Sequence, residues 1–448
     1  MSRWVSLLSV LAGLGCTKPP VDVVIIAVDT LRVDHVSAYN PESPARTPHI
    51  DSLAKDGVTH TQAFSPVSVT APAFASLMTG QLPEQHGVLM NLFRGGEPLA
   101  DSAQTLAERF SEHEAGYATG GFVSAYTLRR QVGLNQGFDV YNGGERANRW
   151  GDQTFGTALT WLNNHAGRPI FMWVHSYDPH GPVKRFATPT DTDKLWQNDP
   201  ANHVRIPKYQ RDAEISDPAF YTQMYARGVE YADVQVGRVL KALKAQGRYE
   251  DALVIVLADH GETLTERALW FDHGTSAHVE QLHIPLIIKY PKNARAGSHD
   301  DRLVSLVDVT PTILTQARLP PLPEPAGQPL TSTGVLHTEL AGESSHCKDV
   351  ESLPCRPRGG QGKELAIRSL AQTHIYKRRA EGGQIEVYNR TTDPAELAPQ
   401  AASGPSELGR ALEAMRVDRH ARTYADPPGI QAPRTEETLK LRQLGYVE

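Results

Sequence analysis

The amino-acid sequence predicts an α/β protein built on a large, mostly parallel β-sheet flanked by helices. Three observations lead to this fold class. Short apolar runs rich in valine and isoleucine have the pattern of strands buried on both faces. Segments with helical spacing of apolar residues lie between these runs, which is typical of a parallel sheet covered on both faces. The chain of 448 residues is 40% hydrophobic, so it can bury a large core.

Four of the apolar runs are expected to be strands of this sheet: Val21–Asp29, Pro169–His175, Asp251–Asp259 and Ile284–Tyr290. One helix is expected over residues 101–115, because capping candidates open this segment and Gly116 follows it. A second helix is expected before Gly247, where apolar residues recur at helical spacing, namely Val229, Val236, Val239, Leu240 and Leu243.

A change in composition after Asp308 divides the chain into two units. The large α/β unit is expected over residues 20–320, and a connector rich in proline, with two cysteines, over residues 321–360. Short segments of alternating polarity follow. Residues 361–448 are therefore expected to form a smaller α+β subdomain, a small antiparallel sheet with a closing helix over 434–445.

The N-terminal segment, residues 1–16, resembles a bacterial lipoprotein signal. Arg3 precedes an apolar run, Val5–Leu14, that is too short to span a bilayer, and Cys16 follows it. The resemblance implies lipidation of Cys16. We therefore expect an exported lipoprotein of the cell envelope, on the periplasmic side or at the outer membrane, held to the membrane by a lipid anchor. A plain secretory signal and a buried first segment are the alternatives.

The remaining cysteines, Cys347 and Cys355, bracket a short loop that contains a proline. In an exported protein this spacing favours a disulfide, and two free thiols are the alternative. Two cysteines alone do not make a zinc site.

The charge balance argues against a nucleic-acid partner. The chain has 45 basic and 51 acidic residues, a net charge of −6, and no basic run. A dedicated nucleic-acid binder presents a strongly basic face instead.

Polar residues gather where three of the predicted strands end. They are Asp29 with Thr30, the stretch His175–His180, and Asp259 with His260. The carboxyl ends of parallel strands meet at one edge of a sheet, which is where open α/β folds bind ligands. Carboxylates and imidazoles brought together there, with His273 in a following loop, favour a divalent-metal cluster over isolated caps.

A series of motifs resembles the sulfatase family of the alkaline-phosphatase superfamily. In order along the chain they read VVIIAVDTLRVDHVSAYN, TPHIDSLAKDGV, TAPAFASLMTGQLPEQHGV, DPHGP, LADHGE, IPLIIKYP and LVSLVDVTPTIL. The stretches YNRTTDPAEL and LRQLGYVE resemble the family's C-terminal subdomain. The resemblance implies an alkaline-phosphatase/sulfatase-like fold whose catalytic domain is the 20–320 unit.

The resemblance also implies roles for particular residues. Asp29, Asp259 and His260 match metal ligands, and Thr70 matches the nucleophile, which also contacts the metal. His180 and His273 match residues that hold the anionic head of the substrate and protonate the leaving oxygen. Oxygen ligands with one imidazole favour a single divalent ion, Mn²⁺, Ca²⁺ or Mg²⁺.

The chain departs from sulfatases proper at the nucleophile. Those enzymes carry a cysteine or serine that is oxidised to formylglycine, with an arginine four residues later, whereas this chain has Thr70 and Phe74. Threonine cannot become an aldehyde hydrate. A sulfated threonine has no elimination route, whereas water or an alcohol can attack a phosphothreonine at phosphorus. This favours the phosphoryl-transferring branches of the superfamily.

Several residues have structural alternatives. Thr70 could simply cap a helix, and His180 and His273 could be structural hydrogen-bonding residues. Asp178 with His180 could hold a second metal, although a single ion is favoured. Asp178 itself and three other residues, His175, His278 and His283, are expected to be structural or to support the ligands.

The sequence therefore predicts a metal-dependent hydrolase or phosphotransferase acting through Thr70 on an anionic ester. A phosphodiester or phosphonate ester is favoured, carried by a glycan, a lipid or a small molecule. The alternatives are a sulfuric ester hydrolase of the arylsulfatase type and a catalytically inactive binding protein. Retention of Asp29, Asp259 and His260 argues against the inactive protein, because unpaired buried carboxylates are unfavourable without a metal.

Overall fold

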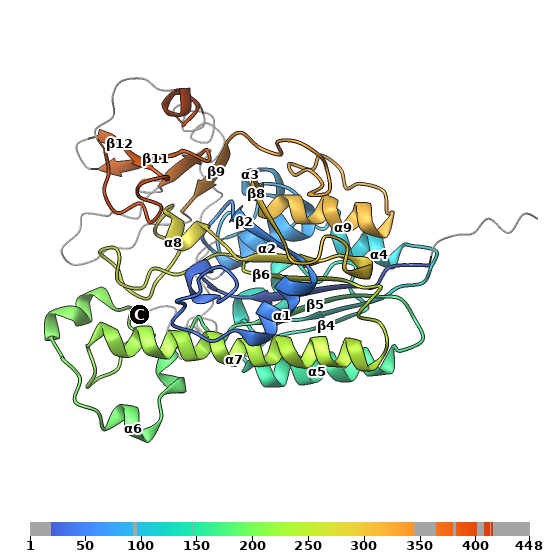
Figure 1. The fold of residues 1–448 in the computed structure, drawn as a ribbon, viewed down its shortest axis with the longest axis horizontal. Helices are drawn as coiled ribbons and strands as arrows, with labels where there is room; N and C mark the ends of the chain where they lie inside the picture. The colour runs from blue at the N-terminus through green and yellow to red at the C-terminus, as the bar shows by residue number, and fades with distance from the viewer. Residues whose placement is uncertain are drawn as a thin grey trace, which may run out of the picture.

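Two β-sheets organise the structure, an eight-stranded sheet in the body of the molecule and a four-stranded sheet beside one end of it (Figure 1). The computed structural model describes residues 19–92, 96–145, 147–344, 364–379, 382–400, 407–412 and 414. The expected α/β fold with a large flanked sheet and a smaller C-terminal sheet is confirmed.

The large sheet has the strand order β4-β3-β5-β1-β6-β7-β2-β8. Neighbouring strands run parallel, except that β7 is antiparallel to both β6 and β2. The sheet is thus mostly parallel, as expected. Its strands are β1 (Val23–Val28), β2 (Val58–Phe64), β3 (Ala118–Phe122), β4 (Val140–Asn142), β5 (Ile170–Ser176), β6 (Leu253–Leu257), β7 (Leu286–Lys289) and β8 (Ser298–Ser305).

The centre of the large sheet is formed by the apolar runs of the sequence. Every residue of β1 is buried, because β5 and β6 flank it and helices cover both faces. In the register, Ala27 lies opposite Leu257. Asp29 lies two residues after Ala27, and Asp259 lies two residues after Leu257. The two carboxylates therefore lie side by side at the edge of the sheet.

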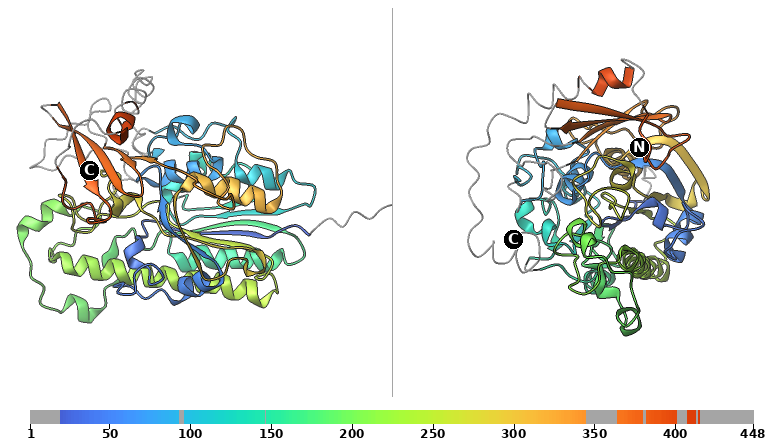
Figure 2. Two further views of the ribbon diagram at one scale, coloured as in Figure 1. Left: turned by 45° about the horizontal axis from the view of Figure 1, so that its top comes forward. Right: turned by 90° about the vertical axis from the view of Figure 1, so that its left-hand side faces the viewer.

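Helices cover both faces of the sheet (Figures 1 and 2). In Figure 1, α1, α5 and α7 lie below the sheet, and α2, α4 and α9 lie above it. The bounds of the α-helices are α1 (Pro48–Asp56), α2 (Thr70–Thr79), α3 (Pro83–His86), α4 (Leu106–Ser111), α5 (Gly151–Asn164), α6 (Pro189–Thr192), α7 (Pro218–Ala245), α8 (Val279–Leu282) and α9 (Val309–Ala317). Short 3-10 turns are η1 (Val33–His35), η3 (Tyr126–Leu128), η4 (Arg130–Val132), η5 (Val183–Phe186), η6 (Pro200–Arg205), η7 (Pro291–Asn293) and η8 (Leu306–Asp308).

The helix expected over residues 101–115 is shorter than predicted. It is α4, and it begins only after Thr105, whose hydroxyl accepts a hydrogen bond from the Glu108 backbone N–H while the Glu108 carboxylate accepts one from the Thr105 N–H. This capping box fixes the first helical residue. The helix expected before Gly247 is the 28-residue α7, which buries its apolar face as predicted.

The small sheet is antiparallel and has the order β12-β11-β10-β9. It begins at β9, which contacts the large unit through a bridge between Val67 and Glu343. A small apolar cluster, which includes Phe64, Leu282 and Ile375, packs between the two units. The bounds are β9 (Leu340–Glu343), β10 (Leu365–Arg368), β11 (Gln372–Arg379) and β12 (Gly382–Asn389).

Three expectations from the sequence lie outside the described residues. They are the signal segment 1–16 with Cys16, the Cys347–Cys355 disulfide, and the closing helix over 434–445. Within the described part of the chain, no helix combines the length and the apolar character that crossing a membrane requires.

Candidate active site

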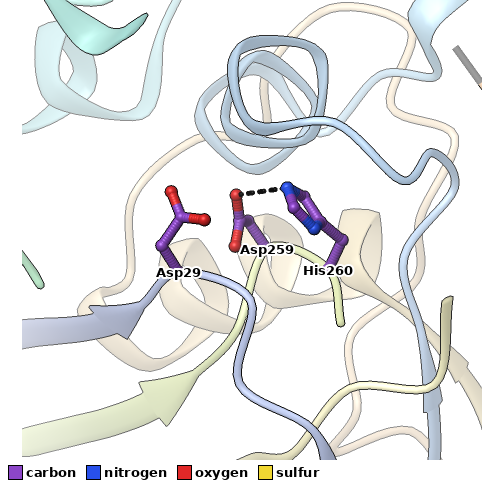
Figure 3. A group of neighbouring side chains, drawn as sticks. All are labelled: Asp29, Asp259 and His260. Carbon is purple, nitrogen blue, oxygen red and sulfur yellow. Dashed lines mark ion pairs between the residues drawn. The ribbon is translucent and has the colours of Figure 1, made fainter. Parts of the chain in front are cut away.

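Two carboxylates and one imidazole meet at the carboxyl edge of the large sheet. Asp29 follows β1, and Asp259 and His260 follow β6, so the strand arrows in Figure 3 lead directly to them. One ligand atom from each of the three side chains lies within 4.8 Å of the others, and all three residues are buried. His260 Nε2 is 3.3 Å from Asp259 Oδ2.

The two carboxylates are held in an environment that disfavours their charge. Burial and the neighbouring Asp29 carboxylate together raise the pKa of Asp259 to about 7, against the opposing effect of His260. Burial also raises the pKa of Asp29 well above its usual range, and the charge of Glu262 adds to this, whereas the nearby Thr70 hydroxyl lowers it. Two acids so close together cannot both ionise without a compensating cation.

The donor set fits a divalent metal ion. Asp29 Oδ1 and Asp259 Oδ2 are buried and make no hydrogen bond within the described part of the chain. His260 Nδ1 lies 2.8 Å from the Gly261 carbonyl oxygen, so it carries the proton and leaves Nε2 as the ligand atom. Two carboxylates with one imidazole suit Mn²⁺, Mg²⁺ or Ca²⁺.

A turn after β1 contributes to this arrangement. Thr30 has φ 56°, a left-handed conformation that is unusual for threonine. Its backbone N–H donates a hydrogen bond of 3.3 Å to Asp259 Oδ1, and its carbonyl accepts one of 2.6 Å from the Tyr225 hydroxyl. The strained turn therefore fixes Asp259 from the end of a neighbouring strand.

Thr70 does not cap α2, so the structural alternative for this residue is wrong. Thr70 is the first helical residue, the N-cap is Val69, and no side chain at the N-cap makes a capping hydrogen bond. Asn91 Oδ1 accepts the hydrogen bond of the Ala71 N–H, at 3.0 Å, from outside the helix. The Thr70 hydroxyl instead lies 3.3 Å from His260 Nε2 and is buried in the carboxylate cluster.

The imidazoles of His273 and His180 continue from the cluster in a row. The ring of His273 is 4.6 Å from that of His260, and the ring of His180 is 4.7 Å from that of His273. Glu262 Oε2 lies 3.2 Å from His273 Nδ1 and orients that ring. The Tyr177 hydroxyl lies 2.7 Å from His180 Nε2, and the two rings stack. The structure thus places both predicted histidines beside the cluster.

Phe74 places an aromatic ring one helical turn after Thr70, where sulfatases proper carry an arginine. Its ring is fully buried and meets the His175 ring edge-on at 5.2 Å. Burial lowers the pKa of His175 to about 3, so the imidazole is neutral. His175 Nδ1 accepts a hydrogen bond from the Ser124 N–H, so Nε2 donates to Asp29 Oδ2 at 3.2 Å. His175 therefore supports a predicted ligand, as the sequence suggested.

Asp178 is not available for a second metal ion. Its carboxylate is paired with Arg185 at 3.1 Å and accepts hydrogen bonds from the Ser176 hydroxyl and the Gly151 N–H. Within the described residues, one group of side chains fits a metal ion, and it does not include Asp178 or His180. The expectation of a single metal site agrees with this geometry.

The loop that carries His273 is held by the C-terminal unit. Ala277 and Val279 donate backbone hydrogen bonds to Glu364 and Glu396, and Arg368 donates to the Ala277 carbonyl. We call these three side chains, Glu364, Arg368 and Glu396, the C-terminal clamp. The clamp also engages His278, whose Nδ1 is 3.3 Å from Glu396. His283, the other histidine expected to be structural, contacts the Thr61 carbonyl at 2.9 Å.

Sequence reasoning missed Glu262, Asn91 and Tyr177. Glu262 could have been predicted, because it lies two residues after His260 in the DHGE motif. Tyr177 also lies in a motif, between His175 and His180, but its contact depends on how that turn folds. Nothing in the local sequence marks Asn91, whose role arises only because a loop distant from Thr70 in the chain closes over α2.

Buried carboxylates, an imidazole and a hydroxyl lie together at the carboxyl edge of a mostly parallel sheet, in keeping with membership of the alkaline-phosphatase superfamily. Within that class, the chain belongs to the Sulfatase family, whose sequence profile matches residues 21–319.

Curated relatives are similar over most of this chain. An ulvan-active sulfatase of Formosa agariphila is 27% identical over 318 residues, which cover 64% of this chain and 51% of the relative. An endo-4-O-sulfatase of Bacteroides thetaiotaomicron is 24% identical over 376 residues, which cover 68% of this chain and 73% of the relative. The chain thus matches about half the length of the first of these proteins.

Among solved structures, the fold is similar to that of a phosphonate monoester hydrolase of Agrobacterium radiobacter. The TM-score is 0.67, the sequence identity is 20%, and the match covers 95% of this chain and 96% of the other. At this identity the likeness shows a shared fold.

Proposed function

We propose that this chain hydrolyses an anionic ester, with Thr70 as the nucleophile and a phosphodiester or phosphonate ester as the favoured substrate. One observation carries the proposal. The Thr70 hydroxyl sits at the start of α2 without capping it and lies against His260 and the two buried carboxylates. A hydroxyl that is buried among predicted metal ligands and unused by the helix is well suited to attack.

Asp29, Asp259 and His260 would hold one divalent cation, with the Thr70 hydroxyl beside it. When bound, this cation supplies positive charge that neutralises the substrate anion and lowers the pKa of the hydroxyl. His175, which donates to Asp29, and Thr30, which donates to Asp259, keep the carboxylates in place.

The side chains around the cluster suggest a two-step reaction. In the first step Thr70 Oγ1 gives its proton to solvent and bonds to phosphorus or sulfur. The bond from that atom to the leaving alcohol oxygen breaks, and His273, which holds a proton on Nε2, donates it to that oxygen. In the second step the oxygen of a water molecule bonds to the same atom and one proton of this water passes to His273 Nε2. The bond to Thr70 Oγ1 then breaks, and Oγ1 takes a proton back from solvent. Glu262 keeps His273 Nδ1–H engaged so that Nε2 carries the transferred proton. His180 binds the anionic head.

The nucleophile favours phosphorus over sulfur. A phosphorylated or phosphonylated threonine can be hydrolysed at phosphorus, whereas a sulfated threonine requires direct attack at sulfur. The similarity of the fold to a phosphonate monoester hydrolase is in keeping with this choice. A sulfuric ester remains the second candidate, because the matching family is Sulfatase and the two curated relatives described above are sulfatases, one of them active on ulvan.

A panel of three aryl esters tests the proposal: a phosphodiester, a phosphonate monoester and a sulfate. We expect the metal-loaded protein to hydrolyse the phosphorus esters and to turn over the sulfate weakly or not at all. Thr70→Val, which replaces the hydroxyl by a methyl group, is expected to lower kcat at least about a thousandfold, and Thr70→Ser to retain part of the activity. A phosphoryl or phosphonyl adduct on the Thr70 peptide should be trapped by rapid acid quench and mass spectrometry.

Sulfate hydrolysis that survives Thr70→Val would show that water attacks directly, and the proposal would be wrong. Absence of both hydrolysis and metal binding would favour the inactive binding protein.

We also propose that the protein is exported and anchored through a lipid on Cys16. The proposal is supported by the N-terminal sequence, in which the run Val5–Leu14 lies between Arg3 and Cys16. Intact-mass analysis of protein extracted from membranes is expected to show a lipidated N-terminus at Cys16 and oxidised Cys347 and Cys355. A protein that begins at Met1 would contradict the lipid anchor on Cys16. Reaction of Cys347 and Cys355 with an alkylating agent would contradict the disulfide.

A further inference from the structure

The segment between β5 and α7 lies against the loop that carries His273. Figure 1 shows this segment, with α6 at its tip, projecting at the same end of the molecule as the small sheet. The backbone N–H of Trp270 donates a hydrogen bond of 2.8 Å to the Arg205 carbonyl, and the Tyr209 hydroxyl donates one of 3.4 Å to the Phe271 carbonyl. The projecting segment therefore forms a wall beside His273.

The same wall contacts His180. The ring of Tyr209 is 5.6 Å from the His180 ring, and Gln210 Nε2 donates a hydrogen bond of 2.6 Å to the His180 carbonyl oxygen. Residues 205–210 thus contact His180 itself and, at Trp270 and Phe271, the loop that carries His273. We therefore expect the side chains exposed on this segment to lie near the part of the substrate that extends from the scissile ester.

The wall exposes a cation stacked on an aromatic ring. The Arg205 guanidinium lies over the Trp270 ring, 4.9 Å from its centroid, and Arg205 is exposed. Among the residues that the structure describes, no carboxylate lies within ion-pair distance of Arg205. Nearby cations differ, because Lys184, Arg185 and Arg227 are paired with Asp212, Asp178 and Asp191.

An arginine stacked in this way is suited to bind an oxyanion. Stacking holds the guanidinium plane and leaves its N–H edge available for two parallel hydrogen bonds to a sulfate, phosphate or carboxylate. The chain as a whole has a net charge of −6 and repels polyanions at long range. A local unpaired cation is therefore significant for binding a substrate with several negative charges.

The separation from the reactive site suits a second group on one substrate molecule. Trp270 precedes His273 by three residues, which span at most about 11 Å when fully extended. This is the scale of one or two sugar units. The half-buried rings of Trp270 and Tyr209 add an apolar surface on which a sugar ring can lie.

We propose that Arg205 and Trp270 form a second anion-binding subsite, which selects an oligosaccharide carrying another sulfate, phosphate or carboxylate next to the scissile ester. The proposal rests on the proposed function for the position of the ester, and it names the substrate class. Arg205 binds the second anion, and the stacked Trp270 fixes the orientation of the guanidinium.

Calorimetric binding tests the subsite without relying on hydrolysis. The full-length protein carrying Thr70→Val is loaded with Mn²⁺ and titrated with two disaccharides, one with a single sulfate and one with a sulfate on each sugar. Adding Arg205→Ala is expected to weaken binding of the disulfated disaccharide 10- to 100-fold, because a charge-assisted hydrogen bond is lost. Binding of the monosulfated disaccharide is expected to be unchanged. A dicarboxylated disaccharide shows whether the subsite distinguishes sulfate from carboxylate.

Two controls sharpen the result. Lys241→Ala removes an exposed cation from α7, away from the wall, and is expected to leave both affinities unchanged. Arg205→Lys is expected to restore part of the affinity, because it keeps the charge and loses the planar stack. Equal losses from Arg205→Ala and Lys241→Ala, or no loss from Arg205→Ala, would overturn the subsite. If the ester panel shows no hydrolysis while Arg205→Ala still loses binding, the proposed function fails and the subsite stands.

Discussion

Replacing Asp259 by asparagine separates the energetic effect of the buried carboxylates from that of the metal ion they are proposed to bind. The substitution keeps the shape of the side chain and removes its charge. In the wild-type chain without metal, burial and the nearby Asp29 raise the pKa of Asp259 from 3.8 to about 7. The carboxylate therefore ionises far less readily in the folded protein than in the unfolded chain.

The difference between the pKa of Asp259 in the folded protein and in the unfolded chain determines how the stability changes with pH. The folded state holds the Asp259 proton more tightly, so the stability that this proton provides is fully present below about pH 4 and is lost as the pH rises to about 7. A difference of about three pH units corresponds to roughly 4 kcal/mol, an upper value for a single buried group coupled to another. At pH 8, metal-free Asp259→Asn is therefore expected to be more stable than wild type, by about 2–4 kcal/mol.

Bound metal ion is expected to reverse the order of stability, so that wild type becomes more stable than Asp259→Asn. A ligand at a thousand times its Kd stabilises the folded state by about 4 kcal/mol, and the variant lacks one of the charged ligands. The assay is urea unfolding at pH 5 and pH 8, in EDTA and in Mn²⁺, with bound metal measured by elemental analysis. The advantage of the variant in EDTA should shrink at pH 5, where wild-type Asp259 is protonated.

Asp178→Asn is the matched control. Asp178 is also fully buried at this edge of the sheet, but its carboxylate is paired with Arg185. We expect this variant to be destabilised in both EDTA and Mn²⁺ and to bind metal normally. If Asp259→Asn is less stable than wild type in EDTA at pH 8, and Mn²⁺ stabilises both proteins equally, the ligand assignment and the electrostatic reasoning are both wrong.

Two further predictions concern the surroundings of His273. Glu262→Gln is expected to lower kcat about 10- to 100-fold with metal content unchanged, because it weakens the contact that orients His273 Nδ1; unchanged kcat would remove Glu262 from the site. Glu396→Gln is expected to lower the free energy of unfolding by about 3 kcal/mol at pH 7, because Arg368 and His278 lose a buried anionic partner. Burial raises the pKa of Glu396, but the charge of Arg368 and the contact with His278 outweigh burial and hold this pKa below its usual value. Wild type should therefore lose this contribution as the pH falls below about 4.5, and the difference between the two proteins, measured by urea unfolding, should shrink there. A difference independent of pH would count against the ion pairs.

The central strands and the metal cluster were predictable for a simple reason. Runs such as Val23–Val28 are apolar throughout, which fits only a strand buried on both faces, and the residue after such a strand must lie at the ligand-binding edge. Asp29 and Asp259 could therefore be expected together before any side-chain contact was known.

The outer strands were not predictable in the same way. β8 reads SHDDRLVS, and its first half is polar because it lies at an edge of the sheet, where solvent replaces a covering layer. β3 reads ATGGF, and its glycines give no periodic signal. In β3, Gly120 is required because a Cβ there would lie 2.9 Å from the Trp161 ring, a contact that exists only after α5 packs on the sheet.

Residues that act through tertiary contacts were also missed. Asn91 supplies the cap of α2 from another loop, and that contact has no local signal around Thr70. The sequence allowed Thr70 to be the N-cap of α2. This role was excluded only by the structure, in which Val69 is the N-cap. The pairing of Asp178 with Arg185 likewise depends on how the turn after β5 folds back on itself.

The C-terminal clamp has a consequence for how the chain folds during synthesis. Val279 and Glu396 are 117 residues apart in the sequence, and Arg267, at the other end of the same loop, is 129 residues from Glu396. Such contacts have high contact order and close late, because a long stretch of chain must first be ordered between them. The strands of the large sheet and the carboxylates at its edge are all encoded before Val309, so they can assemble while the clamp is still being translated. The loop that carries His273 acquires its fixed surroundings only when residue 396 has emerged, so it is completed after the carboxylate cluster.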